Sequence, residues 1–355
     1  MSQRYAILGS GLILILAVMN YFYFGDVLNA KGPLNLRLRP SASLSVVIVT
    51  RALQRGYVDN LYRSLLAKVK VSELREVVFI VPDEEIQYFR RSLDENVNRS
   101  DFVVYADSQC FSESTRGQVN LVKSGWLKQQ LVKLAASSLM KSDFYLVMDS
   151  DNLFVRSTSV SDLINDEGRA ITDMHRVRED DTTTLDWLSA SAEALNIRGE
   201  YKSLLVHGSV ISVTPQILSV AIAQSLISRL DVLSAGQGWV SYLLDRSSNS
   251  TRFWTEYMLY HSHAVHSGMF RLYHEPGKTK QVSIWSKTVV TKPLLDSIFN
   301  ESLSNPRGHF SLIQSNRWWK WNETAEDVWR MIASYYPPAV HNRTMMSCFK
   351  CPKPP

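Results

Sequence analysis

The residues best suited to chemistry in this 355-residue chain form an acidic triplet, Asp149-Ser150-Asp151. The triplet ends a hydrophobic run, FYLVMD (Phe144–Asp149), that is typical of a buried β-strand. Two carboxylates one residue apart at a strand end are costly to remove from water without a counter-charge. A divalent cation with oxygen ligands supplies that charge, usually with a substrate phosphate in its shell. The alternative interpretation is a polar loop that caps the next turn.

Other uses of paired aspartates fit the sequence less well. An EF-hand needs an oxygen ligand at the fifth loop position, where this chain has Leu153. A phosphohydrolase that forms an aspartyl phosphate is closer, but it usually carries its aspartates on the first strand. Here three predicted strands precede the triplet and Asn152 follows it. The phosphate-binding pattern GxxxxGK[ST] is absent.

Alternating strands and helices precede the triplet. Continuous β-branched runs predict buried parallel strands, and apolar residues at helical spacing separate them. The predicted strands are Ser45–Thr50, Arg75–Pro82, Asp101–Asp107 and Phe144–Asp149, and the predicted helices include Tyr57–Val69 and Gly125–Leu139. This order indicates an α/β fold with a mostly parallel sheet, in which ligands bind beyond the carboxyl ends of the strands.

The second half of the chain has a more mixed pattern. We expect a strand pair, or a strand kinked at Gly208, over Leu204–Pro215, and a helix over Gln216–Leu230. An aromatic-rich segment, Phe253–Val265, follows, and His309–Ser315 predicts a late strand. No repeat or linker divides this part, so we expect a single domain over residues 44–340.

Residues 5–24 contain no Asp, Glu, Lys or Arg and are long enough to cross a bilayer as a helix. We interpret them as a membrane anchor after a cytosolic tail, residues 1–4; a cleaved signal peptide and a buried helix are the alternatives. A stem, residues 25–43, and a C-terminal tail, residues 341–355, flank the domain. Five glycosylation sequons support a lumenal body. Their asparagines are Asn98, Asn249, Asn300, Asn322 and Asn342.

Composition excludes several classes of protein. Three cysteines in 355 residues exclude a disulfide-framework miniprotein. Cys348 and Cys351 could form a local disulfide or stay unpaired, and Cys110 is expected to be buried. The formal net charge of +5 comes from Lys and Arg scattered among acids, so no nucleic-acid partner is expected.

Four segments together resemble GT-A-fold nucleotide-sugar glycosyltransferases, and more closely a glycosyltransferase-like family described largely as domains of unknown function. They are GWLKQQLVKL (Gly125–Leu134), FYLVMDSDNLFVR (Phe144–Arg156), HGSVIS (His207–Ser212) and FWTEYMLY (Phe253–Tyr260). The resemblance covers roughly Ser45 to Ile332. It implies a GT-A-like, Rossmann-like sheet flanked by helices, behind a single N-terminal transmembrane helix.

The resemblance also implies a donor site. Asp151 would ligate Mn²⁺ or Mg²⁺, and Asp149 would assist at the metal or contact the ribose. The metal would bridge the two phosphates of a nucleotide-diphosphate sugar. The other donor-binding residues implied are Thr50, Arg51, Gln130, Lys133 and Ser150. Lys133 would pair with phosphate, or else be a solvated helix lysine.

On the acceptor side, Glu256 is the candidate catalytic or acceptor-binding carboxylate. Phe253, Trp254 and Tyr257 would form an apolar wall beside it that raises its pKa. The alternative is an amphipathic helix with buried aromatics and an exposed Glu256. His207 and Gly208 would line the acceptor side, although a strand bulge at Gly208 is the simpler interpretation. Inversion and retention at the anomeric carbon both stay open.

A late histidine often supplies a third metal ligand in such enzymes. His309 is our choice here, and His263, His266 and His274 are the other candidates. The predicted function is therefore a metal-dependent glycosyltransferase acting on a glycan, protein or lipid hydroxyl, as a single-pass type II protein of the Golgi or ER membrane with its domain in the lumen. The alternatives are a metal-dependent phosphohydrolase and a non-catalytic nucleotide- or glycan-binding protein.

Overall fold

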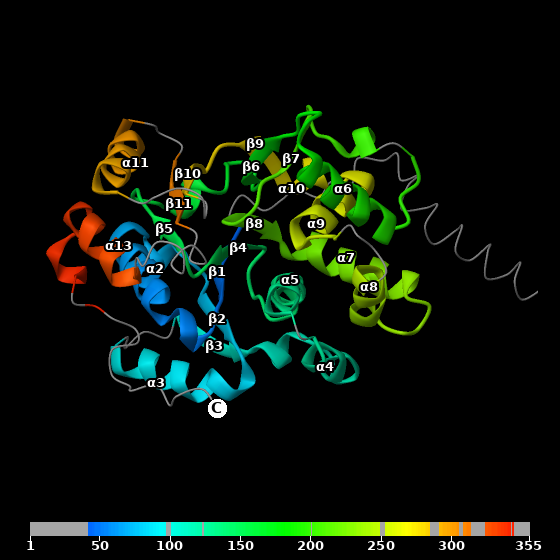
Figure 1. Cartoon of the computed structure of the whole chain (residues 1–355), viewed down its shortest axis with the longest axis horizontal. Helices are drawn as coiled ribbons and strands as arrows, with labels where there is room; N and C mark the ends of the chain where they lie inside the picture. The colour runs from blue at the N-terminus through cyan, green and yellow to red at the C-terminus, as the bar shows by residue number, and fades with distance from the viewer. Residues whose placement is uncertain are drawn as a thin grey trace, which may run out of the picture. The chain divides into compact units, whose positions relative to one another are not determined.

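The computed structural model describes residues 42–96, 101–122, 124–199, 201–248, 253–284, 291–304, 308–313, 324–341 and 343 (Figure 1). These residues belong to one compact unit, Arg39–Pro355. The predicted membrane segment 5–24 lies outside the described residues, as do residues 25–41 of the stem and both tail cysteines. No helix in the described part of the chain is long and apolar enough to cross a membrane. Asn300, the one described sequon asparagine, lies exposed on helix α11 (Lys292–Ser304).

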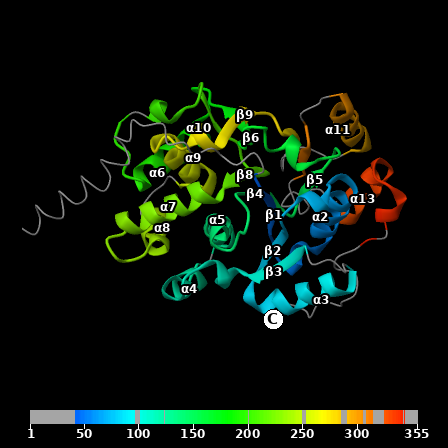
Figure 2. The same ribbon diagram turned by 180° about the vertical axis from the view of Figure 1, so that it is seen from behind.

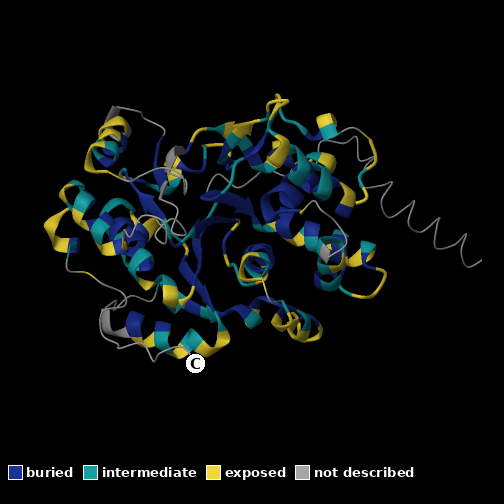
Figure 3. Cartoon of the chain, in the orientation of Figure 1, coloured by how far each residue is buried: buried dark blue, intermediate teal, exposed yellow. Residues whose placement is uncertain are grey.

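A five-stranded sheet forms the centre of the fold, in the order β3-β2-β1-β4-β8. Its strands are β1 (Leu44–Val49), β2 (Val77–Val81), β3 (Phe102–Ala106), β4 (Phe144–Asp149) and β8 (Gln216–Ser219). The first four are parallel, and β8 pairs antiparallel with β4. Figure 3 shows that these strands are buried. The prediction of an α/β fold with a mostly parallel sheet is therefore confirmed.

Helices cover both faces of the central sheet. Alternate residues of each strand point to opposite sides, so each strand contributes apolar side chains to two cores. Val46 and Ile48 of β1 belong to the core under α2 (Arg55–Lys68) and α3 (Ile86–Asn96). Val47 and Val49 belong to the core under α5 (Gly125–Ala135), α7 (Val220–Leu233) and α9 (Glu256–His266). Figures 1 and 2 show α2 and α5 on opposite sides of β1.

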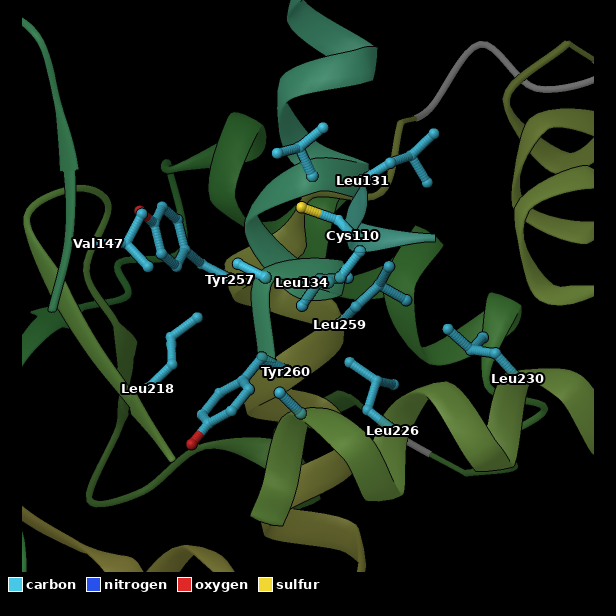
Figure 4. Packing of buried hydrophobic residues seen from close by; sticks show 14 of the residues in the cluster. Cys110, Leu131, Leu134, Val147, Leu218, Leu226, Leu230, Tyr257, Leu259 and Tyr260 are labelled. Carbon is cyan, nitrogen blue, oxygen red and sulfur yellow. The ribbon is translucent and has the colours of Figure 1, made fainter. Parts of the chain in front are cut away.

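Leucine side chains from three helices interlock in the second of these cores (Figure 4). Leu131 and Leu134 come from α5, Leu226 from α7 and Leu259 from α9, and all four are fully buried. Val147 of β4 lies in the same cluster. This packing fixes α5 and α9 against the strand that carries the acidic triplet.

Two three-stranded sheets flank the central one. The first has the order β10-β11-β5, from Lys280–Ile284, Phe310–Ile313 and Asn152–Phe154. The second has the order β7-β6-β9, from Ser209–Ile211, Ala170–Arg176 and His274–Gly277. Strand β5 begins directly after the acidic triplet, so the chain leaves the central sheet at that point.

The remaining helices pack around these sheets. They are α4 (Glu113–Asn120), α6 (Thr182–Ala194), α8 (Trp239–Ser248), α10 (Phe270–Tyr273), α11 and α13 (Ala325–Ile332). Helices α11 and α13 share a separate small core with β5. This core holds β5, the strand that follows the triplet, against α11 and α13.

Two predicted elements of the second half differ from the structure in part. The segment Gln216–Leu230 is not one helix, because its first four residues form β8 and only Val220 onward is helical. For Leu204–Pro215, where we expected a strand pair or a strand kinked at Gly208, the structure has a tight turn at Gly208 flanked by an antiparallel bridge between Val206 and Ser209. Val206 and Ser209 exchange backbone hydrogen bonds of 2.8 and 3.0 Å around it, and both intervening residues have positive φ, 51° at His207 and 76° at Gly208.

Candidate active site at the carboxyl ends of β1 and β4

The sheet changes its winding direction between β1 and β4. The chain continues from β1 through α2 on one face, and it reaches β4 through α5 on the other face. Such a point leaves a crevice beyond the strand ends, where doubly wound proteins bind ligands. Val49 and Asp149 pair at this end of the two strands. A cavity of about 720 Å³ lies there, lined by the ends of β1, β2 and β4 and by α5, α6 and the start of α9.

Both aspartates of the triplet line this cavity, together with Ser150. A tight turn places them there. The backbone N–H of Asp149 donates to Oδ1 of Asn152 at 2.9 Å and to Oγ1 of Thr214 at 3.3 Å, and Thr214 donates to the same Oδ1 at 3.1 Å. Asn152 is fully buried. The triplet is therefore held by a hydrogen-bonded turn.

Three charged side chains meet at the floor of the cavity. The Nζ of Lys133 lies 2.7 Å from Oδ1 of Asp149 and 3.1 Å from Oε1 of Glu256. Lys133 is only 4% exposed and Glu256 only 2%. Neither residue is the solvated helix side chain that the sequence allowed. One buried ammonium group therefore joins two carboxylates from different elements.

Burial and charge act against each other on this cluster. Burial lowers the pKa of Lys133, but Asp149, Tyr257 and Glu256 raise it, and the net pKa is well above that of an ordinary lysine. Burial raises the pKa of Glu256; Lys133 opposes the shift and Asp149 adds to it, so the net pKa stays raised. Lys133 therefore keeps its charge, while Glu256 holds a proton more readily than an exposed glutamate.

Helix α5 positions both carboxylates. Gln129 donates from Nε2 to Oδ1 of Asp149 at 3.1 Å, and Oε1 of Gln130 accepts from the backbone N–H of Glu256 at 2.9 Å. Thr255 caps the start of α9 by accepting from the N–H of Met258 at 3.2 Å. The first turn of α9 is thus tied to α5.

A protein-family model described as a family of unknown function, DUF6492, matches residues 41–340. The chain belongs to this family. No curated protein matches the chain significantly. Among solved structures, the apo form of mouse xyloside xylosyltransferase 1 is similar, with a TM-score of 0.46 and 10% identity over 78% of this chain and 99% of that chain.

Most of the donor-side residues predicted from the sequence of this DUF6492 member lie together. Thr50 and Arg51 line the cavity at the end of β1. Gln130 and Lys133 line it from α5. Tyr257 also lines it, with its ring centroid 5.5 Å from Nζ of Lys133.

The predicted third metal ligand does not join the triplet. His309 does not line the cavity; it is buried elsewhere, with Nδ1 3.0 Å from Oγ1 of Thr158. His274 is buried between Tyr260 and Thr172, and Nε2 of His263 bonds to a serine. No group of three or more His, Cys, Asp or Glu side chains in the described part of the chain is arranged to hold a metal.

Three predicted acceptor residues also lie away from the cavity lining. His207 and Gly208 form the exposed turn before β7. Trp254 is a core residue whose Nε1 donates to the carbonyl of Leu243 at 3.0 Å. These three residues were predicted because they lie beside motif residues in the sequence. The direction of each side chain, however, decides whether it reaches the cavity.

Sequence reasoning missed several residues that line the cavity. Trp126 and Lys128 lie on the first turn of α5, beside the residues that were predicted. Asp107 follows β3 and could have been found, because it is another carboxylate at a strand end. Trp187 lies on α6, far from any motif, and nothing nearby in the sequence indicates its place.

Proposed function

We propose that this DUF6492 protein is a metal-dependent glycosyltransferase that moves a sugar from a nucleotide-diphosphate sugar to a hydroxyl group of an acceptor. The observation that carries the proposal is the cluster of Lys133, Asp149 and Glu256, in a cavity also lined by Asp151. The cavity occupies the switch point of a mostly parallel sheet, which suits a nucleotide. Its volume lies in the range of small-molecule sites, about 300–1,000 Å³.

The nucleotide is assigned to the side of the cavity near β1. Thr50 and Arg51 offer a hydroxyl and a guanidinium group to the base and ribose, and Arg51 is exposed enough to reach a ligand. Ser150 and Gln130 face the same space. Lys133 is proposed to act differently from the sequence-based expectation. Because its two ion-pair partners are carboxylates, it orients Asp149 and Glu256 rather than binding phosphate directly.

The donor atoms of the triplet fit a hard cation such as Mn²⁺ or Mg²⁺. Mg²⁺ is commonly held by one or two carboxylates, with water and substrate phosphate completing its shell. Asp149 and Asp151 would hold the cation here. Lys133 and Gln129 both contact Oδ1 of Asp149 and would orient this carboxylate toward a cation. A bound cation would supply Lewis-acid neutralisation of the diphosphate leaving group.

Glu256 is proposed to receive the proton of the acceptor hydroxyl at a carboxylate oxygen. Burial raises the pKa of this group, and a base whose pKa approaches the working pH transfers protons more effectively. The charge of Lys133 keeps the carboxylate available by opposing that rise. A base in this position fits inversion, whereas a carboxylate that only orients the acceptor fits retention, and the stereochemistry of the product distinguishes them.

The test is a donor screen with the full chain in mild detergent. Common nucleotide-diphosphate sugars are supplied with Mn²⁺, Mg²⁺ or EDTA, and the released nucleotide is measured. We expect slow hydrolysis of one donor that requires a divalent cation. Asp151→Asn keeps the side-chain shape but removes a charge, and it should abolish turnover. Asp180→Asn is the matched control, because Asp180 is exposed and pairs with another exposed residue, Arg178, at 3.0 Å.

Turnover by the Asp151→Asn variant at the wild-type rate would contradict the proposal. A phosphoryl adduct trapped on Asp149 would instead identify a phosphohydrolase. Tight nucleotide binding without turnover of any donor would identify a non-catalytic binding protein.

We also propose that residues 5–24 anchor the protein in the Golgi or ER membrane with the domain in the lumen. The uncharged segment and the five sequons support this topology. Asn300 provides a test, because it is exposed on α11. Expression in a eukaryotic cell should give a form whose mass falls on deglycosylation, and Asn300→Gln should remove part of that difference. A chain carrying no glycan at any sequon would count against a lumenal domain.

A further inference from the structure

Trp126 and Trp187 are aromatic residues of the cavity that the proposed donor chemistry does not use, and Trp187 is the one that also packs against a core. It lies on α6 and lines the cavity. It also packs against a small core formed by Leu188, Ala192, Leu204, Val210 and Met258. One part of the indole is therefore held by the core, while another part faces the cavity. A fixed aromatic surface of this kind binds a flat apolar ligand with little loss of side-chain entropy.

Other residues that line the same cavity also come from the second half of the chain. Val213 and Thr214 precede β8, and Tyr257 follows Glu256 at the start of α9. The residues assigned to the donor come from β1, β4 and α5. Trp187, Val213 and Tyr257 thus line the cavity from the half of the chain that also supplies the proposed base, and we call these three residues the wall.

We propose that this wall, Trp187 with Val213 and Tyr257, is the acceptor subsite and that the acceptor is a carbohydrate. This inference rests on the proposed function and narrows its acceptor from any hydroxyl compound to a pyranose. A pyranose ring presents C–H bonds on a face and hydroxyls around its edge. The C–H face suits the indole of Trp187, because an aromatic ring is electron-rich on its face.

The cavity suits a sugar better than a lipid or a peptide. Its lining mixes apolar side chains with the carboxylates Asp149, Asp151 and Glu256, whereas a lipid chain needs a continuous apolar channel. Extended peptides bind by pairing with the free edge of a sheet. The strands that line this cavity contribute their carboxyl ends and not an edge. Hydroxyls at the rim of a pyranose could instead bond to the carboxylates.

The experiment compares wild type with Trp187→Ala and Trp187→Phe, using methyl pyranosides as acceptor probes with the donor found in the screen. We expect one or more pyranosides to accelerate nucleotide release by the wild-type protein. Trp187→Ala should raise KM for that pyranoside by about tenfold or more, in line with the loss of an aromatic contact. The donor Kd should stay within about twofold. Trp187→Phe should recover part of the loss, because it keeps an aromatic face.

Phe253→Ala is the matched control. Phe253 is an exposed aromatic residue, 46% accessible, and it does not line the cavity. This variant should behave as wild type with every pyranoside. Because Trp187 also contacts a core, each variant's unfolding midpoint is measured, and Trp187→Phe carries the test if Trp187→Ala does not fold.

Several outcomes would overturn the inference. One is stimulation only by a serine- and threonine-containing peptide or by a long-chain alcohol. Another is an unchanged pyranoside KM in a folded Trp187→Ala. If wild type releases no nucleotide from any donor, the proposed function fails, and saturation-transfer NMR with the same pyranosides still tests the subsite. Contact with the sugar protons that disappears in Trp187→Ala supports the subsite; no contact in wild type, or equal contact in both proteins, refutes it.

Discussion

Replacing Lys133 with methionine removes the charge that joins Asp149 and Glu256 while keeping a long side chain. Removing one partner of a buried ion pair costs about 3–5 kcal/mol, because the other charge stays buried. The Asp149 side chain keeps 24% of its exposure and can be hydrated, whereas Glu256 cannot. We therefore expect Lys133→Met to lower the free energy of unfolding by about 3 kcal/mol at pH 8, the lower end of that range.

The loss of unfolding free energy in Lys133→Met should depend on pH, and the pKa of Glu256 determines the direction of this dependence. Burial already raises this pKa in the wild type, and the loss of Lys133 removes the main opposing influence. Between the ordinary glutamate pKa of about 4.3 and the raised folded value, the folded state binds more protons than the unfolded state. The free energy of unfolding therefore falls as pH rises through this window. The variant's deficit should be largest above the folded pKa and should shrink as pH falls toward about 4.3.

Chemical denaturation followed by tryptophan fluorescence at pH 5 and pH 8 measures both quantities. Lys70→Met is the control, since Lys70 lies 3.3 Å from Glu73 and both side chains are exposed, 69% and 38%, so its loss should cost no more than about 1 kcal/mol. Adding Glu256→Gln to Lys133→Met should restore part of the stability, because the uncompensated charge is gone. A Lys133→Met variant as stable as wild type at pH 8, or one that Glu256→Gln does not improve, would refute the reasoning.

Three further predictions use other parts of the molecule. A Cβ on Gly56 would lie 2.8 Å from Cβ of Ala325, so Gly56→Ala should lower the unfolding free energy by about 1–3 kcal/mol, whereas Gly125→Ala, with nothing within 4 Å, should not. Burial raises the pKa of Asp107 to about 6. The folded state therefore binds more protons than the unfolded state between about pH 4 and 6, and this group lowers the unfolding free energy as pH rises through that range. Asp107→Asn should flatten a plot of unfolding free energy against pH there. Finally, EDTA should abolish turnover without lowering the thermal unfolding midpoint, because Lys133 already neutralises Asp149 in the folded protein. A midpoint that falls with EDTA would indicate a structural metal.

The first half of the fold could be predicted closely, because buried parallel strands are continuous apolar runs. Strand β4 has the predicted ends, Phe144 and Asp149, and β1 is displaced by one residue at each end. Strand β8 was missed because it has only four residues and runs directly into α7. Gln216–Ser219 forms a strand because it pairs with β4, and no local sequence pattern indicates this pairing.

The site follows the same division. Residues at strand ends, such as Thr50 and Asp149, could be placed because topology alone brings the carboxyl ends of parallel strands together. Lys133 and Glu256 were named without their contact being foreseen, since that contact depends on how α5 and α9 pack. His309 and Trp254 were misplaced because a side chain's direction in the second half of the chain depends on tertiary packing.

The acidic triplet needs a counter-charge, and Lys133 supplies part of it. Two carboxylates at a strand end require a positive partner, and the sequence pointed to a metal ion. The protein supplies one partner itself, because residues 129 and 133 are four apart on α5 and both reach Oδ1 of Asp149. The polar face of α5 is therefore directed at the cavity and not at solvent. Lys133 also contacts Glu256, so the same charge that neutralises the donor end of the site adjusts the proton affinity of the proposed base. In the proposed mechanism, a change in charge at Asp149 on cation binding would reach Glu256 through Lys133, and this would couple donor binding to acceptor activation.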